Sequence, residues 1–205
     1  IDGYDLLHDS DWADGVDNEE NHFRDDLIGW DFQGNDNDPY DAHGHGTHVA
    51  GIIAAVGNNT RGVSGVNWAA SLMPLRYLNE FNRGQTSDAI LALNYATLMR
   101  QEFDVNVRVT NNSWGRSGDA SAELRGAIQA SAQADILFVA AAGNGNILGR
   151  GVDNDVLPFY PASFDLPNIV SVAASDLNDQ LAMFSNYGLT SVDLATFAGG
   201  IYRDY

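Results

Sequence analysis

The order of apolar and polar residues predicts strands that alternate with helices over the second, larger part of the chain. Short apolar runs bounded by turn residues predict strands at 71–78, 136–142 and 168–174. Apolar residues at helical spacing predict helices at 87–100 and 120–134. Such alternation is typical of an α/β domain whose parallel sheet is covered by helices on both faces.

The predicted helix at 87–100 has Ser87 as its candidate N-cap. Four residues at spacings of three and four form its expected apolar face: Leu91, Tyr95, Leu98 and Met99. A second pattern precedes it, because the small residues of 49–55 are typical of a helix that is buried in tight contact with its neighbours.

Polar segments follow two of the predicted strands. Val105, Val107 and Val109 alternate with polar residues as on a half-buried strand, which runs into 111–115. The strand at 136–142 runs into 143–146. Ligands of parallel sheets bind beyond the carboxyl ends of the strands, so we expect both polar segments to line one cleft at one sheet edge.

The remaining part of the chain, residues 1–45, is polar, acidic and rich in turn residues. One short apolar strand is predicted within it, at 27–32. With 205 residues and 44% hydrophobic content the chain is long enough for one core and short for two, so we expect a single domain over 1–205.

Charge and composition exclude several classes of function. The chain has 28 acidic and 10 basic residues and a net charge of −18, which would repel nucleic acid. It has no cysteine, which excludes disulfides, thiolate catalysis and Cys-based zinc sites. No run is apolar enough to span a bilayer, and the first residues lack the pattern of a signal peptide.

Three histidines lie within six positions, at His43, His45 and His48, in a glycine-rich turn. A metal site is one interpretation, although the spacing differs from the helical His-Glu-x-x-His pattern. Catalysis and a structural role are the others, and the three residues alone leave all of them open.

The whole string His-Gly-Thr-His-Val-Ala-Gly at 45–51 resembles the catalytic-histidine motif of the subtilisin-like serine proteases, the subtilases. Further segments resemble blocks of that family in the family's order: 62–66, 73–76, 112–115, 139–144, 160–163 and 184–188. The resemblance therefore covers nearly the whole chain. It implies a three-layer α/β fold with a mostly parallel, twisted sheet and helices on both faces.

The resemblance also implies a serine endopeptidase with a Ser-His-Asp triad, in which His45 accepts the proton of the serine and returns it to the leaving amine. His48 is then structural, and His43 is exposed at the rim of the cleft. Asn144 matches the asparagine that donates to the oxyanion of the tetrahedral intermediate. Ser113, Trp114 and Gly115 match a segment that pairs with the extended substrate, so Ser113 is not the nucleophile.

The acid of the triad has two candidate alignments. In one, Asp2 is the acid and a local deletion brings Gly3 directly after it. In the other, Gly3, Asp5 and His8 match the pattern of the family, and Ile1 stands where the acid belongs. We favour Asp2, because an Asp after an apolar residue is otherwise hard to explain there.

Resemblance to the family's calcium site implies an oxygen-only Ca²⁺ shell. Its side-chain ligands would be Asp11 and Asn59, with carbonyl oxygens at Val56, Arg61 and Val63. A bare turn at 57–60 is the alternative, and the acidic stretch 36–41 is a weaker second candidate for a metal site.

The serine of the family lies in a Gly-Thr-Ser-Met-Ala type of motif, which this chain does not contain. Segment 192–200 resembles the lead-in to that motif, so we expect a partial domain truncated before it. The expected protein is secreted and monomeric and acts on polypeptides. A catalytically inactive, subtilase-like module that binds peptides or calcium is the alternative.

Overall fold

The computed structural model describes residues 14–198, so Ile1, Asp2 and Asp11 lie outside the described residues. The chain forms two compact units, 1–92 and 93–205, and the boundary falls within one helix. The single domain expected over 1–205 stays a prediction.

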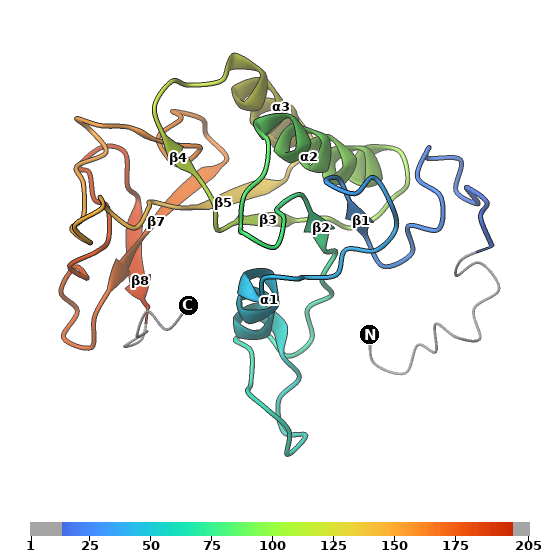
Figure 1. The fold of residues 1–205 in the computed structure, drawn as a ribbon, viewed down its shortest axis with the longest axis horizontal. Coiled ribbons are helices and arrows are strands. Elements are labelled where there is room, and N and C mark those ends of the chain that lie inside the picture. The colour runs from blue at the N-terminus through green and yellow to red at the C-terminus, as the bar shows by residue number, and fades with distance from the viewer. Residues whose placement is uncertain (1–13, 199–205) are drawn as a thin grey trace. The chain divides into compact units, whose positions relative to one another are not determined.

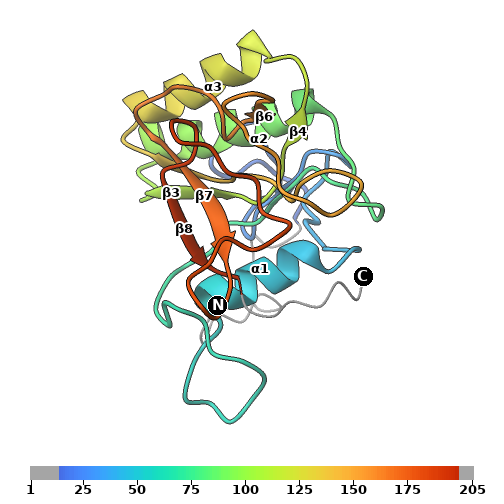
Figure 2. The same ribbon diagram turned by 90° about the vertical axis from the view of Figure 1, so that its left-hand side faces the viewer.

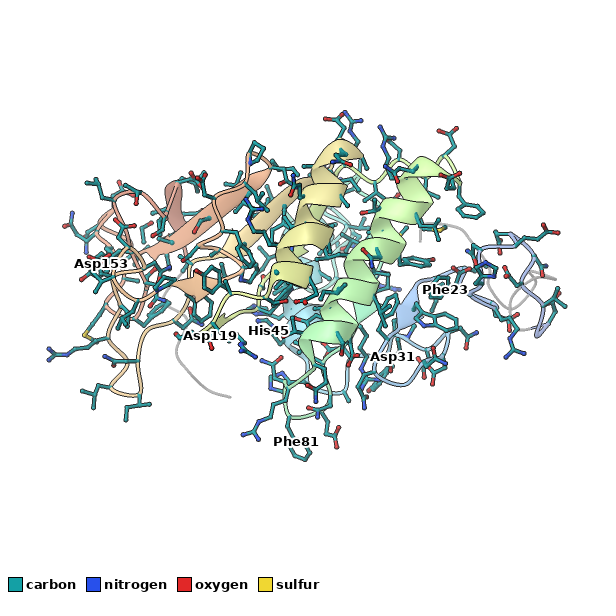
Figure 3. The ribbon with its side chains drawn as sticks, turned by 90° about the horizontal axis from the view of Figure 1, so that it is seen from above. Phe23, Asp31, His45, Phe81, Asp119 and Asp153 are labelled. Atoms are coloured by element: carbon teal, nitrogen blue, oxygen red, sulfur yellow. The ribbon has the colours of Figure 1, made fainter. Side chains whose placement is uncertain are left out.

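The first unit holds a short parallel pair of strands, β1 (Trp30–Asp31) and β2 (Leu75–Arg76). The two strands lie within the predicted segments 27–32 and 71–78 but are only two residues long. Asp31 (Figure 3) is buried in β1. Its carboxylate pairs with the guanidinium of Arg76. This ion pair joins the two strands at the position where Asp31 and Arg76 are in register.

Helix α1 (His45–Ala54) contains the small-residue run, but none of its residues is buried, so the prediction of a buried helix is wrong. Its close contact is with its own following loop, in which the backbone N–H groups of residues 65–67 donate to carbonyls of Ala55, Ile52 and Ile53. These bonds at 2.8–2.9 Å satisfy carbonyls that the end of a helix leaves without partners. The small side chains therefore leave room for the backbone of the following loop to approach this end of the helix.

Helix α2 (Thr86–Gln101) confirms the predicted helix, although it begins one residue before the predicted cap, Ser87. Its buried face comprises Ala89, Ala92, Leu93, Tyr95, Ala96, Thr97 and Met99. Leu91 is 51% exposed, so its assignment to the apolar face is wrong. Leu91 lies two residues after the buried Ala89. In a helix of 3.6 residues per turn this places Leu91 about 200° further around the axis, on the side opposite to Ala89.

The second unit is built on a four-stranded parallel sheet (Figure 1). Its order is β3 (Val109–Asn112), β5 (Leu137–Ala141), β7 (Ile169–Ser175) and β8 (Leu194–Phe197). Figure 2 shows β7 and β8 side by side, with Val172 in register with Leu194. β8 was not predicted, since its residues were interpreted as the lead-in to a helix.

Helix α3 (Ala122–Gln133) packs on β5 and carries the core of this unit. Figures 1 and 3 show α3 and the C-terminal half of α2 over one face of the sheet. Ile128 of α3 and Phe138 of β5 are both fully buried. Ser121 caps α3, because its hydroxyl accepts from the N–H of Leu124 at 3.1 Å.

The strand predicted to contain Val105 and Val107 begins only at Val109. The N–H of Val105 donates to Met99 of α2, and that of Val107 donates to Val105. The N–H groups of Val105 and Val107 are therefore used locally and are not available for hydrogen bonds to a neighbouring strand. Two further short strands, β4 (Arg116–Ser117) and β6 (Phe159–Tyr160), pair antiparallel.

Candidate functional site

Strands β3 and β5 place two predicted site segments at the same edge of the sheet. The strands are parallel neighbours, with Asn112 in register with Ala140. Ser113 follows β3 and Gly143 lies two residues beyond β5, so both segments leave the sheet on its carboxyl side. The prediction that these segments share one edge is confirmed.

Asn144 is exposed on a turn that has a left-handed glycine on each side. Gly143 has φ 114° and Gly145 has φ 77°, conformations that side chains with a Cβ rarely adopt. A Cβ on Gly145 would lie 2.2 Å from the carbonyl oxygen of Arg150. The two glycines therefore let the backbone turn sharply and present the Asn144 side chain to solvent.

A buried asparagine, Asn186, binds this turn at both ends. Its backbone N–H donates to the carbonyl of Gly143 at 2.9 Å, and its Oδ1 accepts from the N–H of Gly145 at 2.9 Å. The same Oδ1 accepts from the N–H of Val152 at 3.0 Å. Asn186 is only 3% exposed, so these bonds form away from water.

Asn154 continues the network behind Asn186. The Nδ2 of Asn186 donates to Oδ1 of Asn154 at 3.0 Å, and Nδ2 of Asn154 donates to the carbonyl of Ala142 at 2.8 Å. The N–H of Asn154 donates to the carbonyl of Tyr187. The network thus connects the end of β5 to the segment that follows β7.

The segment Ser113–Trp114–Gly115 lies close to the same turn through Phe159. A Cβ added to Gly115 would lie 2.3 Å from Cε1 of Phe159, and one added to Gly143 would lie 3.1 Å from Cδ1 of the same ring. Phe159 therefore lies against both segments. The Ser113 hydroxyl accepts from the amide of Asn111 at 2.9 Å, and Trp114 Nε1 donates to Oδ1 of Asn112 at 3.2 Å.

His45 belongs to the first unit and is the first residue of α1 (Figure 3). Gly44, at the N-cap, has φ 95° and no side chain to cap the helix. Asp41 takes that role, because its Oδ1 accepts from the N–H groups of His43 at 3.1 Å and Gly44 at 2.8 Å. Its Oδ2 accepts from the N–H of Thr47 at 2.7 Å. One carboxylate thus fixes the turn that carries His45.

The charges of this turn affect two pKa values. Burial opposes ionisation of Asp41, but hydrogen bonds from Thr47, Gly44 and His43 outweigh it and lower the pKa of Asp41 to about 2. Burial lowers the pKa of the half-buried His45, His43 and His48 lower it further, and Asp41 raises it in part. The net effect favours a neutral imidazole, which is the form that accepts a proton.

The other two histidines are exposed, as predicted for His43. The ring of His43 lies edge-on to that of His45, with 6.4 Å between centroids. Among residues 14–198 no three His, Cys, Asp or Glu side chains gather as metal ligands. In the second candidate stretch, 36–41, the carboxylates of Asp36, Asp38 and Asp41 each accept backbone N–H groups, and a metal site there stays a prediction.

The loop 56–63 has an alternating backbone. Asn58, Thr60 and Gly62 have φ between 56° and 61°, and the intervening Asn59 and Arg61 are not in the left-handed region. Positive φ is rare for a β-branched residue such as Thr60. Asn59, Arg61 and Val63 all lie in an exposed loop.

Three residues of the site were not singled out from the sequence, Asn154, Phe159 and Asn186, and Asp41 was named only as part of a candidate metal stretch. Asp41 carried a signal, since an Asp a few residues before a helix is a typical capping residue. Asn186 fell within a segment that was matched only as a block, and its bonds reach 41 positions back along the chain. His45 lies in the first unit, whereas Asn144 and Ser113 lie in the second.

Comparison with known proteins gives a consistent result. The model of the Subtilase family matches residues 7–201. Thermitase of Thermoactinomyces vulgaris is 35% identical over 177 residues, covering 86% of this chain and 57% of thermitase. A thermophilic serine proteinase of Bacillus sp. (strain AK1) is 37% identical over 168 residues, covering 82% of this chain and 37% of the relative.

The fold has known counterparts as well. The crystal structure of a cold adapted subtilisin-like serine proteinase matches with a TM-score of 0.66 and 33% identity, over 82% of this chain and 54% of that one. This confirms the predicted three-layer α/β class. The chain thus spans about half the length of thermitase and of this structure, and less of the Bacillus relative. In residues 14–198 no helix is long and apolar enough to cross a membrane.

Proposed function

The chain belongs to the subtilase family, and on that premise we propose that it is the part of a serine endopeptidase that supplies the general base and the oxyanion donor. The observation that carries the proposal is the pair of fixed turns, one with His45 and the other with Asn144. No Gly-Thr-Ser-Met-Ala string occurs in the 205 residues. We therefore propose that another segment supplies the serine, and we call the joined polypeptide the complete enzyme.

His45 is the general base of the proposed reaction. Its imidazole takes the proton of the serine hydroxyl as the serine attacks the peptide carbonyl, and then gives that proton to the leaving amine. The lowered pKa of His45 supports this role, since a neutral imidazole is needed for the first transfer. The proposed partner is Asp2, which would hold the imidazole in the correct tautomer.

Asn144 is the proposed oxyanion donor. The negative charge of the tetrahedral intermediate develops on the former carbonyl oxygen, and an amide N–H aimed at that oxygen stabilises it. Asn144 is exposed at the sheet edge, on a turn that hydrogen bonds hold at both ends. In a subtilisin the loss of such a donor costs about 10²–10³ in turnover, and this relative sets the expected size.

Ser113, Trp114 and Gly115 are the proposed substrate-binding segment. They continue from β3, so their backbone groups can pair with an extended peptide as an added strand. Gly115 lies against Phe159, which also lies against Gly143, and this contact supports a single substrate cleft at the edge. Polypeptides are therefore the proposed substrates, and location outside the cell rests on the family alone.

Calcium is a proposed structural ligand of the loop 56–63. Asp11 and Asn59 would hold it through side chains, and Val56, Arg61 and Val63 through carbonyl oxygens, an all-oxygen shell that suits Ca²⁺. The positive φ values of Asn58, Thr60 and Gly62 support a tightly turned loop at this position. When bound, the ion would stabilise the loop without entering the reaction.

A fluorophosphonate probe tests the proposal, because it reacts covalently with an activated serine. The complete enzyme should be labelled on one serine outside these 205 residues, and should cleave a casein substrate with the same sensitivity to the probe. Labelling of Ser113, or peptide binding with neither labelling nor cleavage, would overturn the proposal. The second result would identify an inactive binding module.

A further inference from the structure

We propose that Asn186 is a positioning residue for Asn144, which it holds in place for the oxyanion through the two neighbouring peptide groups. This inference rests on the proposed function of Asn144. It concerns a residue that is buried and does not touch the substrate, and that acts only through the turn it binds.

The geometry of the two hydrogen bonds carries the proposal. The carbonyl before Asn144, that of Gly143, accepts from the backbone N–H of Asn186 at 2.9 Å. The N–H after Asn144, that of Gly145, donates to Oδ1 of Asn186 at 2.9 Å. One residue therefore fixes both peptide planes that flank the donor, and so fixes the direction in which the Asn144 side chain leaves the backbone.

The turn needs this restraint because of its glycines. Gly143 and Gly145 have access to far more of φ, ψ space than other residues, so the turn by itself would not define one position for Asn144. A misplacement of about 1 Å in a catalytic group costs about 10²-fold in rate. The bonds from Asn186 supply the order that the glycines do not.

The chemistry of the site requires an amide at position 186. Its Oδ1 accepts from Gly145 and Val152 while its Nδ2 donates to Asn154, whose own Nδ2 donates to Ala142. A carboxylate could accept the first two bonds but could not donate the third. A flipped amide would place its NH₂ group against two N–H donors, so only one orientation satisfies the network.

The close packing of Gly143 against Asn186 also supports a positioning role for Asn186. A Cβ on Gly143 would lie 2.4 Å from Nδ2 of Asn186. The amide of Asn186 thus packs against the backbone at the start of the turn, where a larger residue would displace it. Glycine at position 143 serves this contact as well as the positive φ.

A double-mutant cycle in the complete enzyme tests the proposal, with kcat and KM measured on one chromogenic peptide. Asn186→Ala should lower kcat by about 10- to 100-fold and leave KM nearly unchanged. In an Asn144→Ala background the same substitution should change kcat by less than about twofold, because the donor it positions is absent.

Asn168→Ala is the matched control. Asn168 is also buried, and its amide donates three hydrogen bonds, to Ile128, Ser131 and Ile136. It precedes β7 and so lies at the opposite edge of the sheet from the turn. Its loss should lower the melting temperature as much as that of Asn186, but kcat should stay near wild type.

Two results would overturn the inference: an unchanged kcat in Asn186→Ala, or equal losses with and without Asn144. If Asn186→Ala does not fold, Asn154→Ala gives the same cycle with a smaller expected loss, because Asn186 keeps its own two bonds to the turn and loses only its partner Oδ1 on Asn154. An Asn144→Ala variant with wild-type kcat would instead refute the proposed role of Asn144 itself, and so marks a separate failure.

Discussion

The carboxylate of Asp41 accepts a hydrogen bond from the backbone N–H of Thr47 at 2.7 Å, across the turn that carries His45. Its second oxygen accepts from the N–H of Gly44 at 2.8 Å. The negative charge also lies at the positive end of the helix dipole of α1. Asp41 therefore stabilises the turn in its ionised form, which makes the turn sensitive to acid.

Asp41→Asn should lower the free energy of unfolding by about 0.5–2 kcal/mol at neutral pH, because an amide has one acceptor oxygen where the carboxylate uses two. The pKa of Asp41 is about 2 in the folded state, below its ordinary value of 3.8. Its contribution is thus complete above pH 3.8 and is lost as the pH falls toward 2. The difference between wild type and variant in denaturant titrations should shrink over that range.

Asp38→Asn is the control for this experiment, since it removes one exposed carboxylate of the same acidic stretch, which accepts from the N–H of Tyr40 at 3.2 Å. It should cost less stability at neutral pH than Asp41→Asn. A stability difference between Asp41→Asn and wild type that stays constant from pH 5 to about pH 2 would contradict the capping role.

The same substitution should move the pH profile of the complete enzyme. The charge of Asp41 raises the pKa of His45, so removing it lowers that pKa further. The acidic limb of kcat/KM follows the pKa of the base in the free enzyme and should shift to lower pH in Asp41→Asn. The limb of Asp38→Asn should stay at the wild-type position. A shift to higher pH would show that the sign of the interaction is wrong.

The sequence predicted elements whose pattern is long and self-consistent. Helices α2 and α3 and strands β5 and β7 lie within two residues of their predicted ranges, because many apolar positions define each. The pattern failed where few residues define the element. Strand β3 begins at Val109 because the backbone at Val105 bonds to the end of α2, a contact that side-chain alternation does not report.

The sequence singled out candidate chemical groups of the site but not the residues that support them. His45 and Asn144 stand in strings that resemble blocks of the subtilase family, and that resemblance marks them. Asn186 binds Gly145 across 41 positions, and nothing near it in sequence marks that partner. The predicted burial of α1 was wrong for a similar reason. Small residues allow close contact, but the sequence pattern does not identify the segment that makes this contact.

The hydrogen bond from Gly145 to Asn186 should also protect Asn144 from deamidation. The backbone nitrogen of Gly145 can attack the side-chain carbonyl carbon of Asn144, expel ammonia and close a succinimide, which water opens to Asp or isoaspartate. In Asn186→Ala this nitrogen loses its acceptor, so conversion should be faster during storage at mildly alkaline pH. Peptide mapping by mass spectrometry measures it, and Asn168→Ala should convert at the wild-type rate. Equal rates in all three proteins would refute the protection.

Calcium should raise the melting temperature of the complete enzyme, because a ligand that binds only the folded state stabilises it by mass action. Chelation should reverse the gain, and Asn59→Ala should reduce it. Asn178→Ala, which alters an exposed asparagine in a turn of the other unit, should respond to calcium as wild type does. A melting temperature that does not change with calcium or chelator would remove the loop 56–63 from consideration as a metal site.

The most direct measurement compares His45→Ala with His48→Ala in the complete enzyme. Both variants lose one histidine from α1, three residues apart, but only His45 is assigned to the reaction. We predict that kcat/KM on a peptide substrate falls by about 10³-fold or more in His45→Ala, with unchanged melting temperature, and stays near wild type in His48→Ala. A His45→Ala enzyme that retains wild-type kcat/KM would contradict the account.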